Sequence, residues 1–337
     1  MARHGWAILD VLLVVVTLLL NLIIVLPCIQ QARDESRKSQ CQMNLKLIGL
    51  GLHQYHEQHE SLPPGFALSE NGPYGGWAWS QKILPQIGAS DLAAEFQTRS
   101  DEGLAAVQQH AALRQVMSTF RCPTEAASEY VDHVSVASGS VVDGIVTSSV
   151  ENWGDVFPRS TYFGNAGFLY ASNGGIRYNT HGIPTSLWPL TNAGSLGARG
   201  KSIASQYCDQ RLYGGCFGQN SRVRYLDFTD GTSNALMTGE RYAPVTAASH
   251  ADQVAGHGTW VAVPDCTKAA GLAMTLGDAA VKINIGMPGR EPTTGFGSLH
   301  REGAMFLLGD GSVRFLSENI DLVTYRRLSV IADSTRQ

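Results

Sequence analysis

The stretch WAILDVLLVVVTLLLNLIIVL, from Trp6 to Leu26, determines how this chain is built. Its length matches the roughly 20 apolar residues that cross a bilayer as an α-helix. Only Asp10, Thr17 and Asn21 interrupt it. In lipid the backbone must satisfy its own hydrogen bonds, so a lone spanning segment has to be helical. The sequence therefore predicts one transmembrane helix, with a kink or a change of register at Pro27.

Two other interpretations of this apolar stretch compete with the membrane helix. A buried core helix is disfavoured, because apolar runs of this length usually lie in a bilayer. A cleaved secretory signal fits a short basic start, but its apolar core spans roughly 7 to 15 residues and precedes a small-x-small cleavage site. The run here is longer, and no such site follows Leu26. We expect the segment to stay attached to the rest of the chain.

The segment after Pro27 is free of proline until Pro63 and carries many helix formers. Apolar residues recur in it at helical spacing, so the helix is expected to run on with an apolar stripe facing a partner surface. Gly49 and Gly51 weaken the helical pattern but would let a neighbouring backbone come close. The predicted stripe consists of Leu45, Ile48, Leu52 and Tyr55, widened by Leu47 and Leu50.

The composition bounds the class of protein. The chain has 337 residues with a formal net charge of -4, so it lacks the concentrated positive charge that binding of nucleic-acid phosphates requires. Its charged fraction of 16% is low beside the roughly 25% of soluble domains. Together with 36 glycines, this low charged fraction indicates a turn-rich β protein. The negative net charge excludes DNA and RNA as expected partners.

The remainder of the chain, from about Ser61, alternates short apolar stretches with Gly, Pro, Asn and Asp, which is typical of strands and loops. The sequence AMFLLGDGSVRFL predicts a hairpin that turns at Asp310-Gly311. A further strand is expected after Thr232. Residues 90–117 are helical in composition, with a break near Gly103, and residues 170–200 are typical of surface loops.

The fold class expected from these patterns is α+β. A long N-terminal helix, membrane-spanning in its first part, packs on an antiparallel β-sheet head with large loop-rich insertions. We divide the chain into a membrane anchor (1–27), a helix extension (28–60) and a β-rich head (61–337).

Several motifs carry a resemblance to a known family. The pattern Cys-x-x-Asn-Leu-Lys-x-Ile-Gly-Leu-x-x-His-x-Tyr-His runs from Cys41 to His56 and is followed by SLPPGF. Later come FRCP (120–123), DGTSNALMTGER (230–241) and GSLHREGAMFLLGDGSVRFLSENID (297–321). In this order the motifs resemble those of prepilin-like proteins with a DUF1559 head (SBP_bac_10), which are abundant in planctomycete bacteria.

This resemblance implies a type IV pilin-like anchor and a head whose biochemical role is largely unassigned. A prepilin peptidase would cut between Gly5 and Trp6, and Trp6 would become the new, methylated amino terminus. Asp10 would be the fifth residue of the processed chain, where its carboxylate could meet the free amine of a neighbouring helix in an assembly of pilin-like subunits. The family usually has Phe at the position of Trp6, Glu at that of Asp10 and Asn at that of Met305.

The orientation of the chain across the membrane has two contrary indications. Arg3 precedes the apolar run, whereas Arg33, Arg37 and Lys38 follow it, so a positive-inside count alone would leave the head in the cytoplasm. The resemblance implies an exported head instead. We expect a single-pass protein of the cytoplasmic membrane with a periplasmic or extracellular head.

The cysteines leave several states open. Zinc sites of the usual finger or ribbon type are disfavoured, because the six cysteines include no CxxC pair. In an oxidising compartment Cys41 could pair with Cys122, both of which lie in family-like motifs, and Cys208 could pair with neighbouring Cys216. Free buried thiols are the alternative for both pairs. Cys28, at the membrane boundary, is expected to stay free.

Three further groups of polar side chains are candidates for sites. We expect neither a metal nor a cofactor, and we assign no catalytic residue. Histidines three apart drift around a helix, the Asp-Gly pair is foremost turn chemistry, and no GxSxG elbow is present. The groups are His53, His56 and His59 for a metal, Asp227, Asp230 and Asp310 for calcium, and His250, His257 and His300 for nucleophilic catalysis.

The sequence supports three functions to decreasing degrees. The first is a structural or interaction protein, a pseudopilin-like subunit that presents its head at the cell surface. The second is an exported module that binds a carbohydrate or another extracellular ligand while the helix tethers it. The third, an exported hydrolase, has no motif behind it, so we expect a protein without enzymatic activity.

Overall fold

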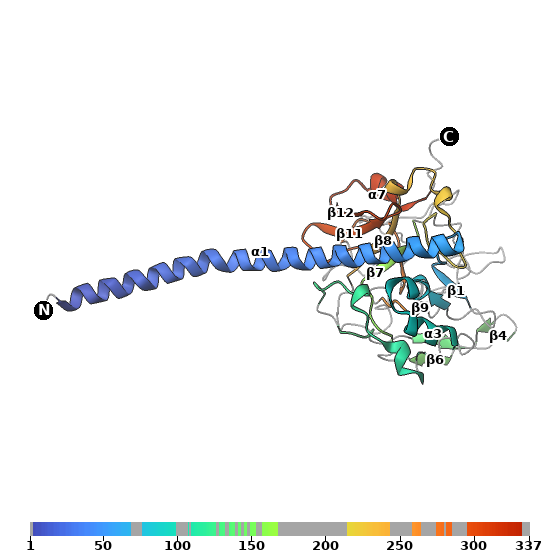
Figure 1. Ribbon diagram of the computed structural model, residues 1–337, viewed down its shortest axis with the longest axis horizontal. Coiled ribbons are helices and arrows are strands. Elements are labelled where there is room, and N and C mark those ends of the chain that lie inside the picture. Colours follow the sequence, from blue (N-terminus) through green and yellow to red (C-terminus); the bar gives the residue numbers. More distant parts are fainter. Residues whose placement is uncertain are drawn as a thin grey trace.

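The computed structural model describes residues 3–68, 76–98, 107, 109–125, 128–131, 135–138, 141–142, 145–146, 149–152, 157–167, 214–242, 258–263, 274–279, 281–284 and 295–331. Helix α1 (Arg3–His59) projects from a head that holds the described strands (Figure 1). The amino terminus lies at the free end of α1, far from the head (Figure 1).

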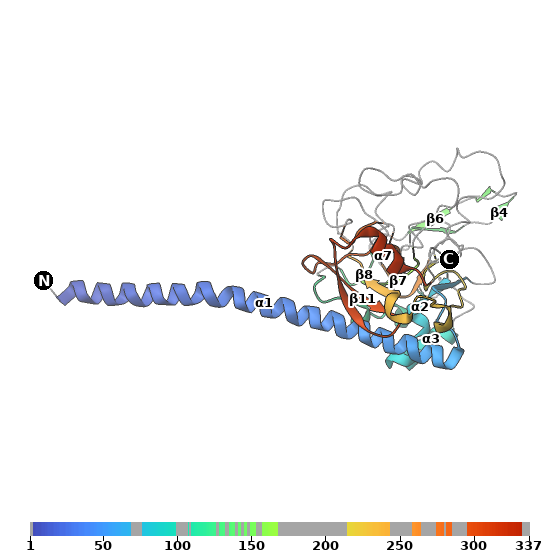
Figure 2. The same ribbon diagram turned by 90° about the horizontal axis from the view of Figure 1, so that it is seen from above.

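Helix α1 is continuous over 57 residues and contains Pro27 in its interior. The helix runs through Pro27 without interruption and changes direction gently near its middle (Figure 2), so the kink or change of register predicted at Pro27 is no more than a shallow bend. The most apolar window of α1 has no buried residue. The apolar side chains from Val11 to Leu26 that the structure describes are all exposed, so none of these described side chains is buried against the head.

The second half of α1 belongs to the core of the head. Leu45, Ile48 and Leu52 are fully buried, which confirms the predicted apolar stripe over these positions. Tyr55 is half-buried against the same core. Leu50, expected to widen the stripe, is instead 52% exposed, because the head covers only one side of the helix.

The two helical glycines admit side chains of the head rather than another backbone. A Cβ atom on Gly49 would lie 2.7 Å from Cδ1 of Leu307, and one on Gly51 would lie 2.8 Å from Cγ2 of Ile87. Both separations are far below an ordinary carbon–carbon contact. The glycines therefore let α1 settle closely onto the sheet and onto the short helix η1 (Pro85–Ile87).

The main sheet of the head has five strands in the order β10-β7-β8-β11-β12. Neighbouring strands pair antiparallel, except that β10 runs parallel to β7. The α+β architecture, with the long helix packed on a mainly antiparallel sheet, is confirmed. The strands are β7 (Tyr162–Asn165), β8 (Leu236–Glu240), β10 (Leu276–Gly277), β11 (Gly303–Leu308) and β12 (Val313–Ser317).

The main sheet is covered on both faces. Alternate residues of β11 point to opposite sides, so Met305 and Leu307 join the core cluster that contains the buried face of α1. Phe306 and Leu308 join a second cluster with Tyr325 of helix α7 (Leu322–Ser329). The layer order is therefore α1, sheet, α7, as Figure 2 shows.

The predicted hairpin is confirmed as β11 and β12. Its connection is longer than a two-residue turn, because the Leu308 amide bonds the Ser312 carbonyl and the Gly311 amide bonds back to Leu308. Gly311 has a φ of 80°, a left-handed conformation that glycine adopts without steric cost. The strand expected after Thr232 is β8.

The remaining elements extend the head beside α1. Helix α3 (Ser90–Thr98) confirms helix near the start of 90–117, but the 3-10 helix η3 (Ala111–Arg114) stands where more α-helix was expected. Gly103 and residues 170–200 lie outside the described residues. The other elements are β1 (Phe66–Leu68), β2 (Gly76–Ala78), α2 (Trp79–Lys82), η4 (Ser118–Phe120), β3 (Ser135–Ser138), β4 (Val141–Val142), β5 (Ile145–Val146), β6 (Ser149–Asn152), η7 (Tyr225–Asp227), η8 (Thr232–Asn234) and β9 (Ala262–Val263).

Candidate functional site

A disulfide joins α1 to the head where the helix enters it. Cys41, on the buried face of α1, is bonded to Cys122, which follows η4, and their Cα atoms are 5.2 Å apart. This is one of the pairings that the sequence left open. Residues 81 positions apart are thereby cross-linked, so the bond restricts the unfolded chain strongly.

Asn44 holds the same two segments together by hydrogen bonds. Its side-chain Nδ2 donates to the main-chain oxygens of Ser118, at 3.2 Å, and Arg121, at 2.9 Å. Asn44 lies one turn beyond Cys41 on α1, on the same face of the helix. The junction between α1 and the head therefore combines a covalent bond with a matched polar contact.

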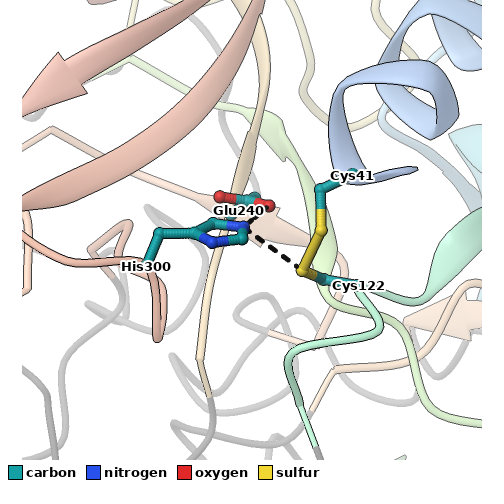
Figure 3. Close-up of side chains that lie close together, drawn as sticks. All are labelled: Cys41, Cys122, Glu240 and His300. Carbon is teal, nitrogen blue, oxygen red and sulfur yellow. Dashed lines mark hydrogen bonds and ion pairs between the residues drawn. A yellow bond between two sulfur atoms is a disulfide. The ribbon is translucent and has the colours of Figure 1, made fainter. Parts of the chain in front are cut away.

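Glu240 and His300 lie directly beside the disulfide (Figure 3). Nε2 of His300 is 3.4 Å from Oε1 of Glu240 and 3.5 Å from Sγ of Cys122. The side chains of His300 and Glu240 are only 5% and 1% exposed. A buried carboxylate is costly unless it is paired, and the His300 imidazole is the partner that the geometry offers.

The backbone around Glu240 fixes the loop that carries His300. The other carboxylate oxygen, Oε2, accepts a hydrogen bond from the amide of Met305 at 2.8 Å, and the Glu240 carbonyl accepts from the amide of Gly297. Ser298 Oγ accepts from the His300 amide and donates to the Gly303 carbonyl. Gly297 and Met305, on either side of His300, are thus both bonded to Glu240, the last residue of β8, and Ser298 bonds to residues within the loop. These bonds position the imidazole of His300.

Two buried ionisable side chains, Tyr162 and Arg241, lie near the junction, and burial shifts the pKa of each. The Tyr162 hydroxyl contacts the Cys41 carbonyl at 3.4 Å, and burial raises its pKa, as does the nearby charge of Glu240. Arg241 lies over the Phe163 ring, with 3.5 Å from its guanidinium carbon to the ring centroid. Burial lowers the pKa of Arg241 to about 9, which leaves it charged at neutral pH.

The four side chains drawn in Figure 3 come from four separate motifs of the sequence. Cys41 opens the first motif, Cys122 lies in FRCP, Glu240 lies in DGTSNALMTGER, and His300 lies in GSLH. No local pattern pointed to a contact between Glu240 and His300. Sequence reasoning grouped His300 with His250 and His257, which lie outside the described residues. The one signal that the four residues share is their membership of the motifs.

These four side chains also include the atoms that bind metals. The two sulfurs, a histidine nitrogen and a carboxylate oxygen all lie within 4.8 Å of one another. The sequence did not predict this group as a metal site, because its members are far apart in the chain. Chemically, the arrangement can form a disulfide lock, hold a buried His–Glu pair, or bind a metal when the thiols are reduced.

The other histidines considered from the sequence pack against an aromatic ring. The centroids of the His53 and His56 rings lie 4.9 Å and 4.3 Å from that of Tyr225. Nε2 of His56 accepts a hydrogen bond from the Tyr225 amide, so it is occupied. His59 contacts Tyr55 instead. His53 and His56 therefore pack against the Tyr225 ring, whereas His59 is exposed. Burial, together with His56, lowers the pKa of His53.

The aspartates considered for calcium act in local turns. Asp227 accepts a hydrogen bond from the Arg224 amide and pairs with its guanidinium, and this lowers the pKa of Asp227. Asp310 accepts from the Ser312 amide in the hairpin connection. Asp230 offers its carbonyl to the Asn234 side chain. Asp227, Asp230 and Asp310 are not brought together as one site among the described residues.

Two further cysteines, Cys28 and Cys216, are free among the described residues. Cys216 is a free, buried thiol that donates to the Leu236 carbonyl at 3.3 Å, which is the alternative to its pairing with Cys208. Cys208 lies outside the described residues, and Cys28 is free and exposed. Gly5, Trp6 and Asp10 lie in the first turns of α1, where the side chains are outside the described part.

Among the described residues, α1 is the one helix long and apolar enough to cross a membrane. A family model described as "Protein of unknown function (DUF1559)", SBP_bac_10, matches residues 30–323. The match covers the junction and most of the head but begins after the apolar run. Neither the comparison with curated proteins nor that with solved structures gave a match.

Proposed function

Because this chain belongs to the DUF1559 family, whose description assigns no activity, we propose a role from its geometry. The protein is a membrane-anchored, exported structural or interaction protein of the pseudopilin type. The observation that carries the proposal is the division of one continuous helix, exposed and apolar in its first half and buried in the head in its second. Such a helix can couple a membrane or a filament core mechanically to the head.

The junction supports a role in which α1 transmits force to the head or holds the head in a fixed orientation. The disulfide and the Asn44 hydrogen bonds prevent the buried half of α1 from sliding out of the head. A disulfide also persists best in an oxidising compartment. The Cys41–Cys122 bond therefore supports a head on the outer side of the cytoplasmic membrane, although the positive charges at Arg33, Arg37 and Lys38 favour the opposite orientation by themselves.

The exposed apolar half of α1 needs a nonpolar environment. The bilayer supplies one, and the equivalent helices of other pilin-like subunits would supply another after assembly. In the processed form, prepilin peptidase removes the residues up to Gly5 and leaves a methylated Trp6, with Asp10 near the new amine. Mass spectrometry of the mature amino terminus tests this form, and an intact Met1 or Ala2 would eliminate it.

Thiol labelling tests the orientation. Cys28 is exposed just beyond the apolar run, so a membrane-impermeant maleimide added to spheroplasts should label it. Because other thiols are present, labelling of Cys28 is measured as the signal that is lost in the Cys28→Ser variant. Asp34→Cys in that background, at a site 61% exposed, should restore labelling farther from the lipid. Labelling of both positions only after lysis would contradict an exported head.

We propose no catalytic activity, since the clustered polar side chains are used in the junction. The alternative, a tethered module for an extracellular ligand, depends on loops in residues 170–200, which lie outside the described residues. A glycan-array screen of the full-length protein in detergent tests it, and a saturable ligand would favour the alternative.

A further inference from the structure

The junction of α1 and the head has the ligand types of a zinc site. Structural and catalytic zinc ions bind thiolate sulfur, histidine nitrogen and carboxylate oxygen, usually in a tetrahedral set of four. Cys41, Cys122, Glu240 and His300 supply two sulfurs, one nitrogen and one oxygen. All four residues are buried, and their ligand atoms converge on one point between α1, β8 and the His300 loop (Figure 3).

The distances fit the edges of such a tetrahedron. With zinc bonds of about 2.3 Å to sulfur and about 2.0–2.1 Å to nitrogen or oxygen, the S···N edge is about 3.5 Å and the N···O edge about 3.3 Å. Nε2 of His300 lies 3.5 Å from Sγ of Cys122 and 3.4 Å from Oε1 of Glu240. In the disulfide state, two of the edges therefore already have these lengths.

The second oxygen of Glu240 orients the first toward this point. Oε2 is occupied by the Met305 amide, at 2.8 Å. Oε1 is fully buried and makes no hydrogen bond within the described residues, where its close polar contact is the His300 nitrogen. A buried oxygen without a hydrogen bond calls for an explanation, and metal ligands are typically fixed by such outer contacts of their other atoms.

We propose that reduction of the Cys41–Cys122 disulfide converts the junction into a zinc site with Cys41, Cys122, His300 and Glu240 as ligands. A dithiol reductant supplies two electrons and two protons to the disulfide and is itself oxidised to a cyclic disulfide. The two thiols then lose their protons as zinc binds, which gives two Zn–S bonds and two free protons. The zinc site is independent of the membrane role and of the orientation of the chain.

The two states exclude each other, because they use the same sulfur atoms. Either state ties Cys41 of α1 to Cys122 of the head, so the junction remains closed in a reducing and in an oxidising environment. Zinc also protects the thiols from oxidation, since a metal-bound thiolate is not available to form the disulfide.

Metal binding by the full-length protein in detergent tests the proposal. One sample is kept oxidised, and another is reduced with a dithiol, desalted without oxygen and incubated with Zn²⁺ or Co²⁺. The reduced protein should retain one equivalent of zinc more than the oxidised protein. With Co²⁺ it should show thiolate-to-cobalt charge transfer and the intense visible bands of a tetrahedral ion.

The variants separate the junction from the other thiols. The double variant Cys41→Ser, Cys122→Ser retains the remaining cysteines and should lose the extra equivalent and the cobalt spectrum. His300→Gln keeps the disulfide and should weaken zinc binding by at least about tenfold, the loss seen even for outer-shell partners. His59→Gln, an exposed histidine of α1, is the matched control and should change nothing.

The wild-type protein alone can overturn the proposal, which protects the test from variants that fail to fold. The fluorescence of the buried Trp79 and Trp260 shows whether the reduced head is still folded. Equal zinc content in the reduced and oxidised samples would refute the site. Zinc binding that is unaffected by His300→Gln would also refute it, because the metal would then be held by thiols alone.

Discussion

Asn44 donates a hydrogen bond from its side-chain amide to the main-chain oxygen of Arg121, at 2.9 Å. The bond joins the turn of α1 that carries Cys41 to the residue directly before Cys122. A second bond from the same nitrogen reaches the Ser118 carbonyl. The disulfide therefore closes between two segments that a single asparagine already aligns.

Asn44→Ala should destabilise the head by about 1–3 kcal/mol, because the main-chain oxygens of Ser118 and Arg121 would each lose one donor. Urea unfolding followed by tryptophan fluorescence measures the change. Met43→Ala, one residue earlier and 59% exposed, is the matched control and should change the free energy of unfolding little. Equal effects of the two substitutions would show that Asn44 does not hold the junction.

Removal of the disulfide should cost about 4–5 kcal/mol, the chain-entropy value for a closed loop of this size. The variant is Cys41→Ala, Cys122→Ala, and the measurement is the urea midpoint with and without a dithiol. Wild type should lose stability on reduction in metal-free buffer, whereas the variant should not respond. Cys28→Ser serves as the control, since Cys28 is exposed and free.

Gly49→Val should destabilise the contact of α1 with β11 by about 1–3 kcal/mol, the usual cost of overpacking a core. The side chain would begin 2.7 Å from Cδ1 of Leu307. Leu307→Ala should be destabilising by itself, but it should recover part of the Gly49→Val loss in the double variant. Strict additivity of the two free-energy changes would rule out this contact as the cause.

Acidification should destabilise the head through His53. Burial, with help from His56, lowers the pKa of His53 from its ordinary value of 6.5, so the folded state favours the neutral ring. The unfolded chain then binds more protons, and stability falls as the pH drops below about 6.5 until it reaches the lowered pKa. His53→Gln should flatten this part of the stability–pH curve relative to His59→Gln. An unchanged curve would contradict the assignment.

Local signals in the sequence predicted the elements that depend on short-range physics. Asp310-Gly311 between two apolar runs predicted the hairpin, and Leu45, Ile48 and Leu52 predicted the buried face of α1. In each case the period of the apolar residues or the turn chemistry is contained in a few neighbouring residues. Leu50 was the exception, since only the tertiary structure decides how far the head wraps around the helix.

The contacts of the junction could not be derived in this way. His300 and Cys122 are 178 positions apart, and nothing in their local sequence specifies that they meet. The pairing of Cys41 with Cys122 was one of several that the cysteines allowed. Long-range contacts of this kind depend on the strand order β7-β8-β11, which the apolar pattern does not encode.

Whether the first half of α1 lies in lipid is decided by how the unprocessed full-length chain partitions between membrane and soluble fractions. Membranes from expressing cells are washed with alkaline carbonate and then extracted with detergent, and the chain is followed by immunoblotting. We predict that it stays in the carbonate pellet and is released by detergent alone. Recovery of the intact chain in the soluble fraction before any detergent is added would contradict a membrane-spanning α1.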